Sequence, residues 1–160
     1  MRKPLNHMNF VIVNVFNQQN DLEISSKKIS SLVKHVIKEE GQTCDEVNIY
    51  LVDTPTICDL HQKFFDDPTP TDCISFPIDT EEDELCYRLL GEVFVCPATA
   101  KEYALLHSGN PLEETSLYIV HGLLHLMGYD DISDNDCIIM RAAEQRHMQS
   151  LKKSKKLLGE

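Results

Sequence analysis

The sequence lacks any long hydrophobic run. Its apolar stretches fall short of the about 18–20 residues that a membrane-spanning helix needs, so no membrane partner is expected. The first six residues, MRKPLN, lack the apolar core of a signal peptide, and no secretory leader is expected either. These two absences favour a cytoplasmic protein.

Closely spaced cysteine pairs are also missing. The chain has six cysteines, but no two of them form a CxxC pair, and most lie inside apolar runs. In a reducing cytosol such cysteines behave as small buried hydrophobic residues. We therefore expect no disulfide framework.

Basic residues are scarce relative to acidic ones. Lysine and arginine number 15 against 26 aspartate and glutamate residues, which gives a formal net charge of −11. This balance argues against a broad basic surface for nucleic acid, and no DNA partner is expected, although a local basic cleft stays open. With 160 residues, 42% of them hydrophobic, the chain fits one globular domain spanning 1–160.

Hydrophobic periodicity predicts an α+β domain with elements in the order β-α-β-α-β-β-α-α-α. Thr54 is the expected N-cap of the second helix, Asn110 and Pro111 begin the fourth, and Gly128 ends it. Residues 79–84, which are mostly acidic, are interpreted as a solvated loop. We expect one mixed sheet of about four strands, covered mainly on one face, with about five helices. The predicted strands are 9–15, 47–52, 73–76 and 91–96, and the predicted helices are 25–40, 54–65, 97–107, 110–127 and 133 through the 140s.

The fourth helix and the turn after it carry a metal-ligand pattern. His121 and His125 are four residues apart, so both imidazoles can point at one ion. Gly128 lets the backbone swing Asp131 back beneath them. The spacing is that of known zinc helices with aspartate in the third position, and aspartate is a zinc ligand. We expect one Zn²⁺ per chain, although other divalent transition metals accept this set.

Two further points bear on this site. Three protein ligands leave an open coordination position, which is typical of catalytic zinc. The alternative, two unpaired core histidines, would be costly to bury. Position 122 holds glycine, where HExxH metalloproteases place their general-base glutamate, so peptide hydrolysis by that mechanism is not expected. Without a side chain at Gly122, the wall beside the metal is expected to be open.

Three segments resemble one known family. Residues 121–131, HGLLHLMGYDD, are similar to the signature H-G-x-L-H-L-x-G-Y-D-H of the YbeY endoribonucleases, also called rRNA maturation factors. Residues 70–77, PTDCISFP, resemble the family's P-T-D-V-L-S-F-P, and residues 90–95, LGEVFV, its L-G-D-I-x-I. With Met140 and Glu144, the resemblance covers nearly the whole chain.

The resemblance implies a single α+β domain with zinc at the end of a cleft. It implies single-strand-specific RNA cleavage, 16S rRNA 3′-end maturation and ribosome quality control, with the small ribosomal subunit as partner in the bacterial cytoplasm. Thr71, Asp72 and Ser75 would line the cleft, and ordinary turn chemistry is the alternative for them.

The chain departs from the family at two positions. The family's third ligand is histidine, and Asp131 in its place should make the ion a weaker Lewis acid. The neighbouring Asp130 matches the family's aspartate and is an alternative third ligand. Phe65 stands where the family has an arginine thought to face the RNA phosphate, and phenylalanine can instead stack on a base. Arg88 and Lys101 are the remaining candidate cations.

The working hypothesis is metal-assisted cleavage of a phosphodiester bond. One alternative is a ribosome-assembly binding factor with a structural metal and little or no cleavage activity. The other is a different metallohydrolase, acting on small phosphoesters or amides. The net acidity fits delivery to RNA by a protein partner better than tight binding to free RNA.

Overall fold

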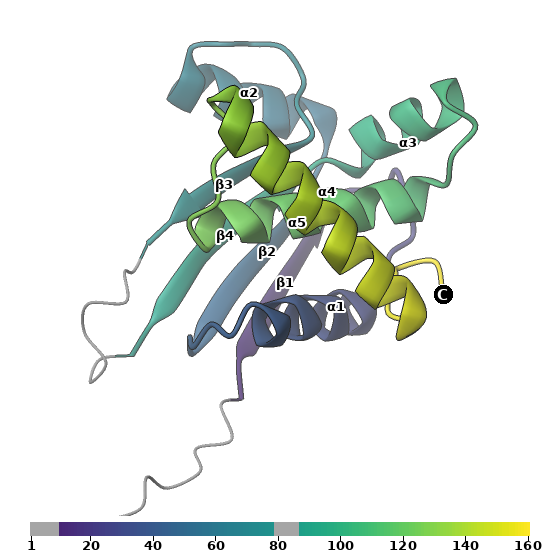
Figure 1. Cartoon of the computed structure of the whole chain (residues 1–160). Coiled ribbons are helices and arrows are strands. Elements are labelled where there is room, and N and C mark those ends of the chain that lie inside the picture. Colours follow the sequence, from purple (N-terminus) through teal and green to yellow (C-terminus); the bar gives the residue numbers. More distant parts are fainter. Residues whose placement is uncertain (1–9, 79–86) are drawn as a thin grey trace, which may run out of the picture.

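The computed structural model describes residues 10–78 and 87–160, and its centre is a mixed sheet of four strands (Figure 1). The acidic segment interpreted as a loop, 79–84, lies outside the described residues. The strands run side by side in the order β1-β2-β4-β3, with β1, β2 and β4 parallel and β3 antiparallel to β4. The expected mixed sheet is confirmed. Its strands are β1 Ile12–Gln18, β2 Glu46–Val52, β3 Cys73–Pro77 and β4 Leu89–Val95.

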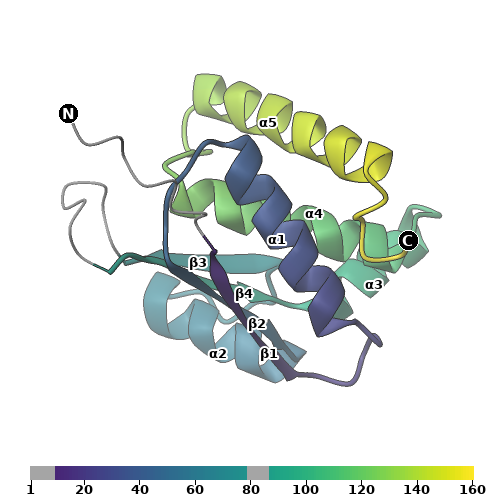
Figure 2. The ribbon, with the colours of Figure 1, turned by 90° about the horizontal axis from the view of Figure 1, so that it is seen from below.

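Helices cover the two faces of this sheet unequally. Figure 2 shows α1, α4 and α5 on one side and α2 on the other. Buried residues of α1 and α4 form the larger core against one face, whereas only a small cluster lies beneath α2. The expected α+β class, with a sheet covered mainly on one face, is confirmed. The helices are α1 Ser26–Glu39, α2 Thr54–Phe65, α3 Pro97–Leu106, α4 Pro111–Leu126 and α5 Asp134–Lys153.

Helix α4 is held between the sheet and α5, and this explains why it is apolar nearly all round. Ile119, Val120, Leu123 and Leu124 are fully buried. Burying each such side chain contributes roughly 1.5–3 kcal/mol, so the helix that carries the two histidines is a rigid part of the core.

Side chains next to the first turn cap α2 and α4, and one of the two predicted N-caps is wrong. Asn110 caps α4 as predicted, since its side chain accepts hydrogen bonds from the backbone N–H groups of residues 112 and 113. The expectation that Thr54 caps α2 is wrong. Asp53 has the extended backbone that follows a strand, and its carboxylate accepts from the Thr56 N–H at 3.0 Å.

Strand pairing explains how the limits of β1 and β4 differ from the predicted ones. Strand β1 extends to Gln18 instead of ending at Val15, because it pairs residue for residue with β2 from Ile12 to Gln18. Strand β4 begins at Leu89, which pairs with Glu46, and it ends before Cys96, which is the N-cap of α3. These limits depend on the partner strand and not on the strand's own sequence.

Within residues 10–78 and 87–160, no helix is both long and apolar enough to cross a membrane. The five described cysteines are free thiols.

Candidate metal centre

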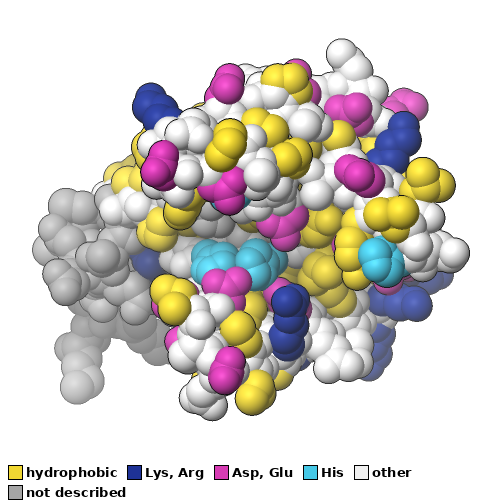
Figure 3. Space-filling model, turned by 90° about the horizontal axis from the view of Figure 1, so that it is seen from above, with side chains coloured by type: hydrophobic (Ala, Val, Ile, Leu, Met, Phe, Trp, Pro, Cys, Tyr) yellow, Lys and Arg dark blue, Asp and Glu magenta, His cyan; other side chains and the backbone are white. Residues whose placement is uncertain are grey.

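Helix α4 and the turn after it bring three candidate ligand atoms together. His121 Nε2 lies 3.0 Å from His125 Nε2, and Asp131 Oδ2 lies 3.5 Å and 3.6 Å from these two nitrogens. All three atoms fall within 4.8 Å of one another, which is the spacing that one shared ion requires. In the space-filling view, adjoining histidine side chains lie in a hollow with acidic side chains beside them (Figure 3).

The other ring nitrogen of each histidine is engaged by an acceptor. His121 Nδ1 lies 2.7 Å from Glu144 Oε1, and His125 Nδ1 lies 3.1 Å from the Tyr129 carbonyl oxygen. A carboxylate and a carbonyl can only accept, so each Nδ1 carries the proton. The two Nε2 atoms then face each other at 3.0 Å. Their spacing requires a proton or a metal ion between them, and with the Asp131 carboxylate beside them the donor set fits a divalent transition metal.

Asp131, and not Asp130, faces the two imidazoles. The Asp130 carboxylate accepts from the backbone N–H of Asp131 at 2.8 Å, so it turns toward its own loop. Gly128 has a φ of +98°, the left-handed conformation that lets the chain reverse after α4. The geometry thus favours Asp131 over its neighbour as the third ligand.

The turn itself is tied to the body of the protein through Glu40. This carboxylate, 11% exposed, accepts from the Tyr129 hydroxyl at 3.0 Å, from Arg146 at 2.7 Å and from fully buried His147 at 2.5 Å. Burial raises the pKa of Glu40, but these three donors outweigh it and hold the pKa below its usual value. Because Tyr129 also supplies the carbonyl that orients His125, the Glu40 network helps to position one of the candidate ligands.

Glu144 on α5 orients His121, as the Tyr129 carbonyl orients His125. Its side chain is only 7% exposed, and its second oxygen accepts from Arg141 Nη1 at 3.1 Å. Burial acts to raise the pKa of Glu144, yet the hydrogen bond and charge of His121, helped by Arg141, lower it overall. The carboxylate therefore stays ionised and holds the His121 ring in place.

Gly122 does not open the wall beside the metal, and that expectation is wrong. The residue is buried against the sheet, where a Cβ atom would lie 2.4 Å from Val93 Cγ1 and 2.8 Å from Cys73 Sγ. The Ser75 hydroxyl donates to the Gly122 carbonyl at 3.0 Å. Glycine is needed here so that α4 can approach β3 and β4 closely, which leaves no room for a glutamate.

His121 and Asp131 line a pocket of about 380 Å³, whereas His125 is not among its lining residues. Of the three residues expected to line a cleft, Asp72 lines it. Thr71 does not, and its carbonyl accepts from the Thr99 hydroxyl on α3. Ser75 does not either, because it binds the backbone of α4. The lining residues are Asp72, Tyr103, Glu114, Leu117, Tyr118, His121, Asp131, Arg141 and Glu144.

The three proposed substrate-binding residues lie outside this lining. Phe65 ends α2 with 58% of its surface exposed, and its ring is 5.8 Å from that of His61. Arg88 precedes β4 and donates to the Thr43 carbonyl. Lys101 is an exposed residue of α3.

Sequence reasoning did not assign roles to Glu144 and Arg141, yet both line the pocket. A signal for Glu144 was present: it sits at helical spacing among Met140, Ala143 and His147, the buried face of α5. A carboxylate in an apolar stripe needs a partner, and here the partner is His121. No local sequence pattern identifies Arg141 as a pocket residue, because its position depends on how α5 crosses α4.

The fold and this site define an α+β protein with a candidate His-His-Asp metal centre on a core helix. A profile of the family described as endoribonuclease YbeY matches residues 14–152. The endoribonuclease YbeY of Protochlamydia amoebophila is 62% identical over 143 residues, covering 89% of this chain and 95% of that protein. The endoribonuclease YbeY of Chlamydia trachomatis serovar D is 34% identical over 145 residues, covering 90% of each. The chain belongs to the YbeY family, as its motifs indicated.

A solved structure shares the fold. The solution structure of a Thermotoga maritima protein matches with a TM-score of 0.64 and 25% sequence identity, and the match covers 91% of this chain and 92% of that one.

Proposed function

We propose that the chain, over residues 1–160, is a metal-dependent endoribonuclease that cuts single-stranded RNA. Endoribonuclease activity follows from membership of the YbeY family. The observation that carries the metal dependence is the convergence of the two Nε2 atoms, 3.0 Å apart, with the Asp131 carboxylate beside them. We propose zinc as the ion, held by His121, His125 and Asp131, because zinc accepts imidazole and carboxylate ligands and tolerates an open position.

The residues of the site have separate tasks. The bound ion supplies Lewis acidity to a phosphoryl oxygen and to water. His121, His125 and Asp131 hold it, while Glu144 and the Tyr129 carbonyl keep both imidazoles in the tautomer that presents Nε2. Asp72, from the loop before β3, contributes a carboxylate to the lining of the pocket.

The biological substrate in this proposal is the 3′ end of 16S rRNA, with a further part in ribosome quality control. The protein would work in the cytoplasm beside the small ribosomal subunit. Its net charge of −11 supports delivery by a protein partner over unaided binding to free RNA.

The test compares cleavage of one labelled RNA in single-stranded and duplex form by zinc-loaded protein purified without a histidine tag. We expect the wild type to cut the single strand and spare the duplex, and Asp131→Ala to lose cleavage. Asp134→Ala, which removes an exposed carboxylate from the first turn of α5, is the matched control and should retain activity. Equal cleavage by wild type and Asp131→Ala would show that the activity does not come from this centre.

The two alternatives give different results in the same series. Co-sedimentation with the small ribosomal subunit without RNA cleavage would favour a binding factor with a structural metal. Hydrolysis of a small phosphoester or amide by protein that leaves RNA intact would favour another metallohydrolase.

A further inference from the structure

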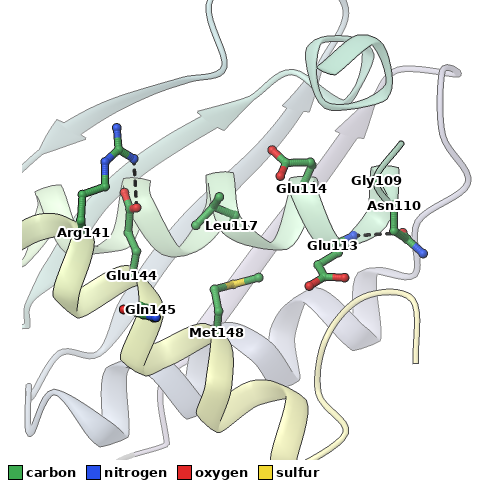
Figure 4. Close-up of a pocket in the computed structure, with 9 residues that line it drawn as sticks. All are labelled: Gly109, Asn110, Glu113, Glu114, Leu117, Arg141, Glu144, Gln145 and Met148. Atoms are coloured by element: carbon green, nitrogen blue, oxygen red, sulfur yellow. Dashed lines mark hydrogen bonds and ion pairs between the residues drawn. The ribbon is translucent and has the colours of Figure 1, made fainter. Parts of the chain in front are cut away.

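The pocket lined by His121 and Asp131 continues into a second cavity between α4 and α5. This groove has a volume of about 510 Å³. Both cavities are lined by Glu114, Leu117, Arg141 and Glu144, so they meet along these four side chains. Figure 4 shows Leu117 of α4 and Met148 of α5 facing the space between the helices. A strand that enters the metal pocket therefore has an open path along the groove.

The pocket is strongly acidic. Four carboxylates line it: those of Asp72, Glu114, Asp131 and Glu144. A bound divalent ion would offset two of these four negative charges. A phosphodiester that approaches the ion must pass these groups, and like charges at short range disfavour its entry. A positively charged side chain at the entrance is needed to offset the remaining repulsion.

Among the described residues that line either cavity, Arg141 is the one lysine or arginine. Its side chain is 76% exposed, in contrast to the 7% of its partner Glu144. The Glu144 carboxylate holds Nη1 at 3.1 Å, so one corner of the guanidinium is fixed while the rest of it faces solvent (Figure 4). A guanidinium has five N–H donors in a rigid fork that suits phosphate oxygens.

We propose that Arg141 binds a phosphate of the RNA strand where the metal pocket opens into the groove between α4 and α5. This inference rests on the proposed endoribonuclease function and names a residue that contacts its substrate. Glu144 serves two groups at once: one oxygen orients His121, and the other orients the Arg141 guanidinium. Arg141, the proposed phosphate-binding residue, and His121, a proposed metal ligand, are thus joined through the same carboxylate.

The test uses zinc-loaded wild type, Arg141→Gln and Arg141→Lys, with Lys152→Gln as a control that removes one exposed charge from the same helix. The readout is kcat/KM on a single-stranded RNA at several salt concentrations, with bound zinc measured in each protein. We expect Arg141→Gln to lower kcat/KM by about tenfold or more, because hydrogen bonds to charged groups are the strong ones.

The salt dependence separates a phosphate contact from a structural role. One phosphate contact to a single strand contributes about 0.7 to the slope of log affinity against log salt, so this slope should flatten by about that amount in Arg141→Gln. Arg141→Lys should keep the slope and lose only part of the rate, and Lys152→Gln should match the wild type. Bound zinc should be equal in all four proteins.

Three results would overturn the inference. If Arg141→Gln keeps the wild-type slope and kcat/KM while the wild type cuts RNA, the inference fails and the proposed function stands. If Arg141→Gln loses zinc in proportion to activity, Arg141 acts only through Glu144. If the wild type itself cuts no RNA, the proposed function fails and the inference falls with it.

Discussion

Removing Glu144 should weaken metal binding even though this residue is not a ligand. Its carboxylate is 7% exposed and lies 2.7 Å from His121 Nδ1. In Glu144→Ala the Nδ1–H loses its acceptor in a buried position, and the ring is free to rotate Nε2 away from the ion. Losing such a partner typically costs about 10–100-fold in metal affinity, which corresponds to about 1.4–2.7 kcal/mol.

The assay is competition for zinc against a chelating dye of known affinity. Glu144→Gln should lose less than Glu144→Ala, since its amide oxygen can still accept from Nδ1. Gln149→Ala, an exposed position on the same helix, is the control and should bind zinc like the wild type. A melting curve for each variant separates local loosening from unfolding. If folded Glu144→Ala binds zinc as tightly as the wild type, the reasoning that this hydrogen bond orients the ligand is refuted.

Three other substitutions have defined outcomes. Gly122→Ala should destabilise the fold by about 1–3 kcal/mol or more in urea denaturation, since its Cβ would lie 2.4 Å from Val93 Cγ1; unchanged stability would contradict the close packing. Glu40→Gln should cost about 2–3 kcal/mol at neutral pH, because the carboxylate loses charge-assisted hydrogen bonds, including that from His147. The pKa of Glu40 is lowered on folding, so its contribution is present above its ordinary value of 4.5 and is lost as the pH falls through the folded value. The stability gap between Glu40→Gln and wild type should therefore shrink in acid, and a gap independent of pH would contradict this assignment. Asp131→His should make the ion a stronger Lewis acid and move the rising limb of the pH–rate profile for RNA cleavage to lower pH; a shift to higher pH would contradict the account.

Much of the fold could be predicted because its signals are local. Asn110 and Pro111 marked the start of α4, Gly128 marked its end, and apolar periodicity located the other helices. A boundary that depends on a partner was missed: β1 ends where its pairing with β2 ends. The cap of α2 was misassigned by one residue, since Asp53 and not Thr54 accepts from a backbone N–H of the helix.

In the candidate site too, some residues could be predicted from local sequence and others depend on how the helices pack. His121 and His125 lie one helical turn apart and Asp131 follows a left-handed glycine, so local geometry was enough to predict that they meet. The groups that support them come from elsewhere in the chain. Glu144 and Arg141 are contributed by α5 and Glu40 by the end of α1, and only the packing of these helices brings them to the site.

The same limit explains the outcome at Gly122. In the sequence, Gly122 has no side chain and follows the candidate ligand His121, and this suggested an open wall beside the metal. In space it faces the sheet, because a residue that follows His121 by one position points about 100° away around the helix.

The most direct test of the central claim is the metal content of the purified protein. The chain, made without a histidine tag and incubated with zinc, would be analysed by elemental mass spectrometry as wild type, Asp131→Ala and Asp130→Ala. We predict close to one zinc per chain in the wild type and in Asp130→Ala, and a sharp loss in Asp131→Ala. A wild type that binds no zinc, or an Asp131→Ala variant that keeps all of it, would contradict the three-residue centre.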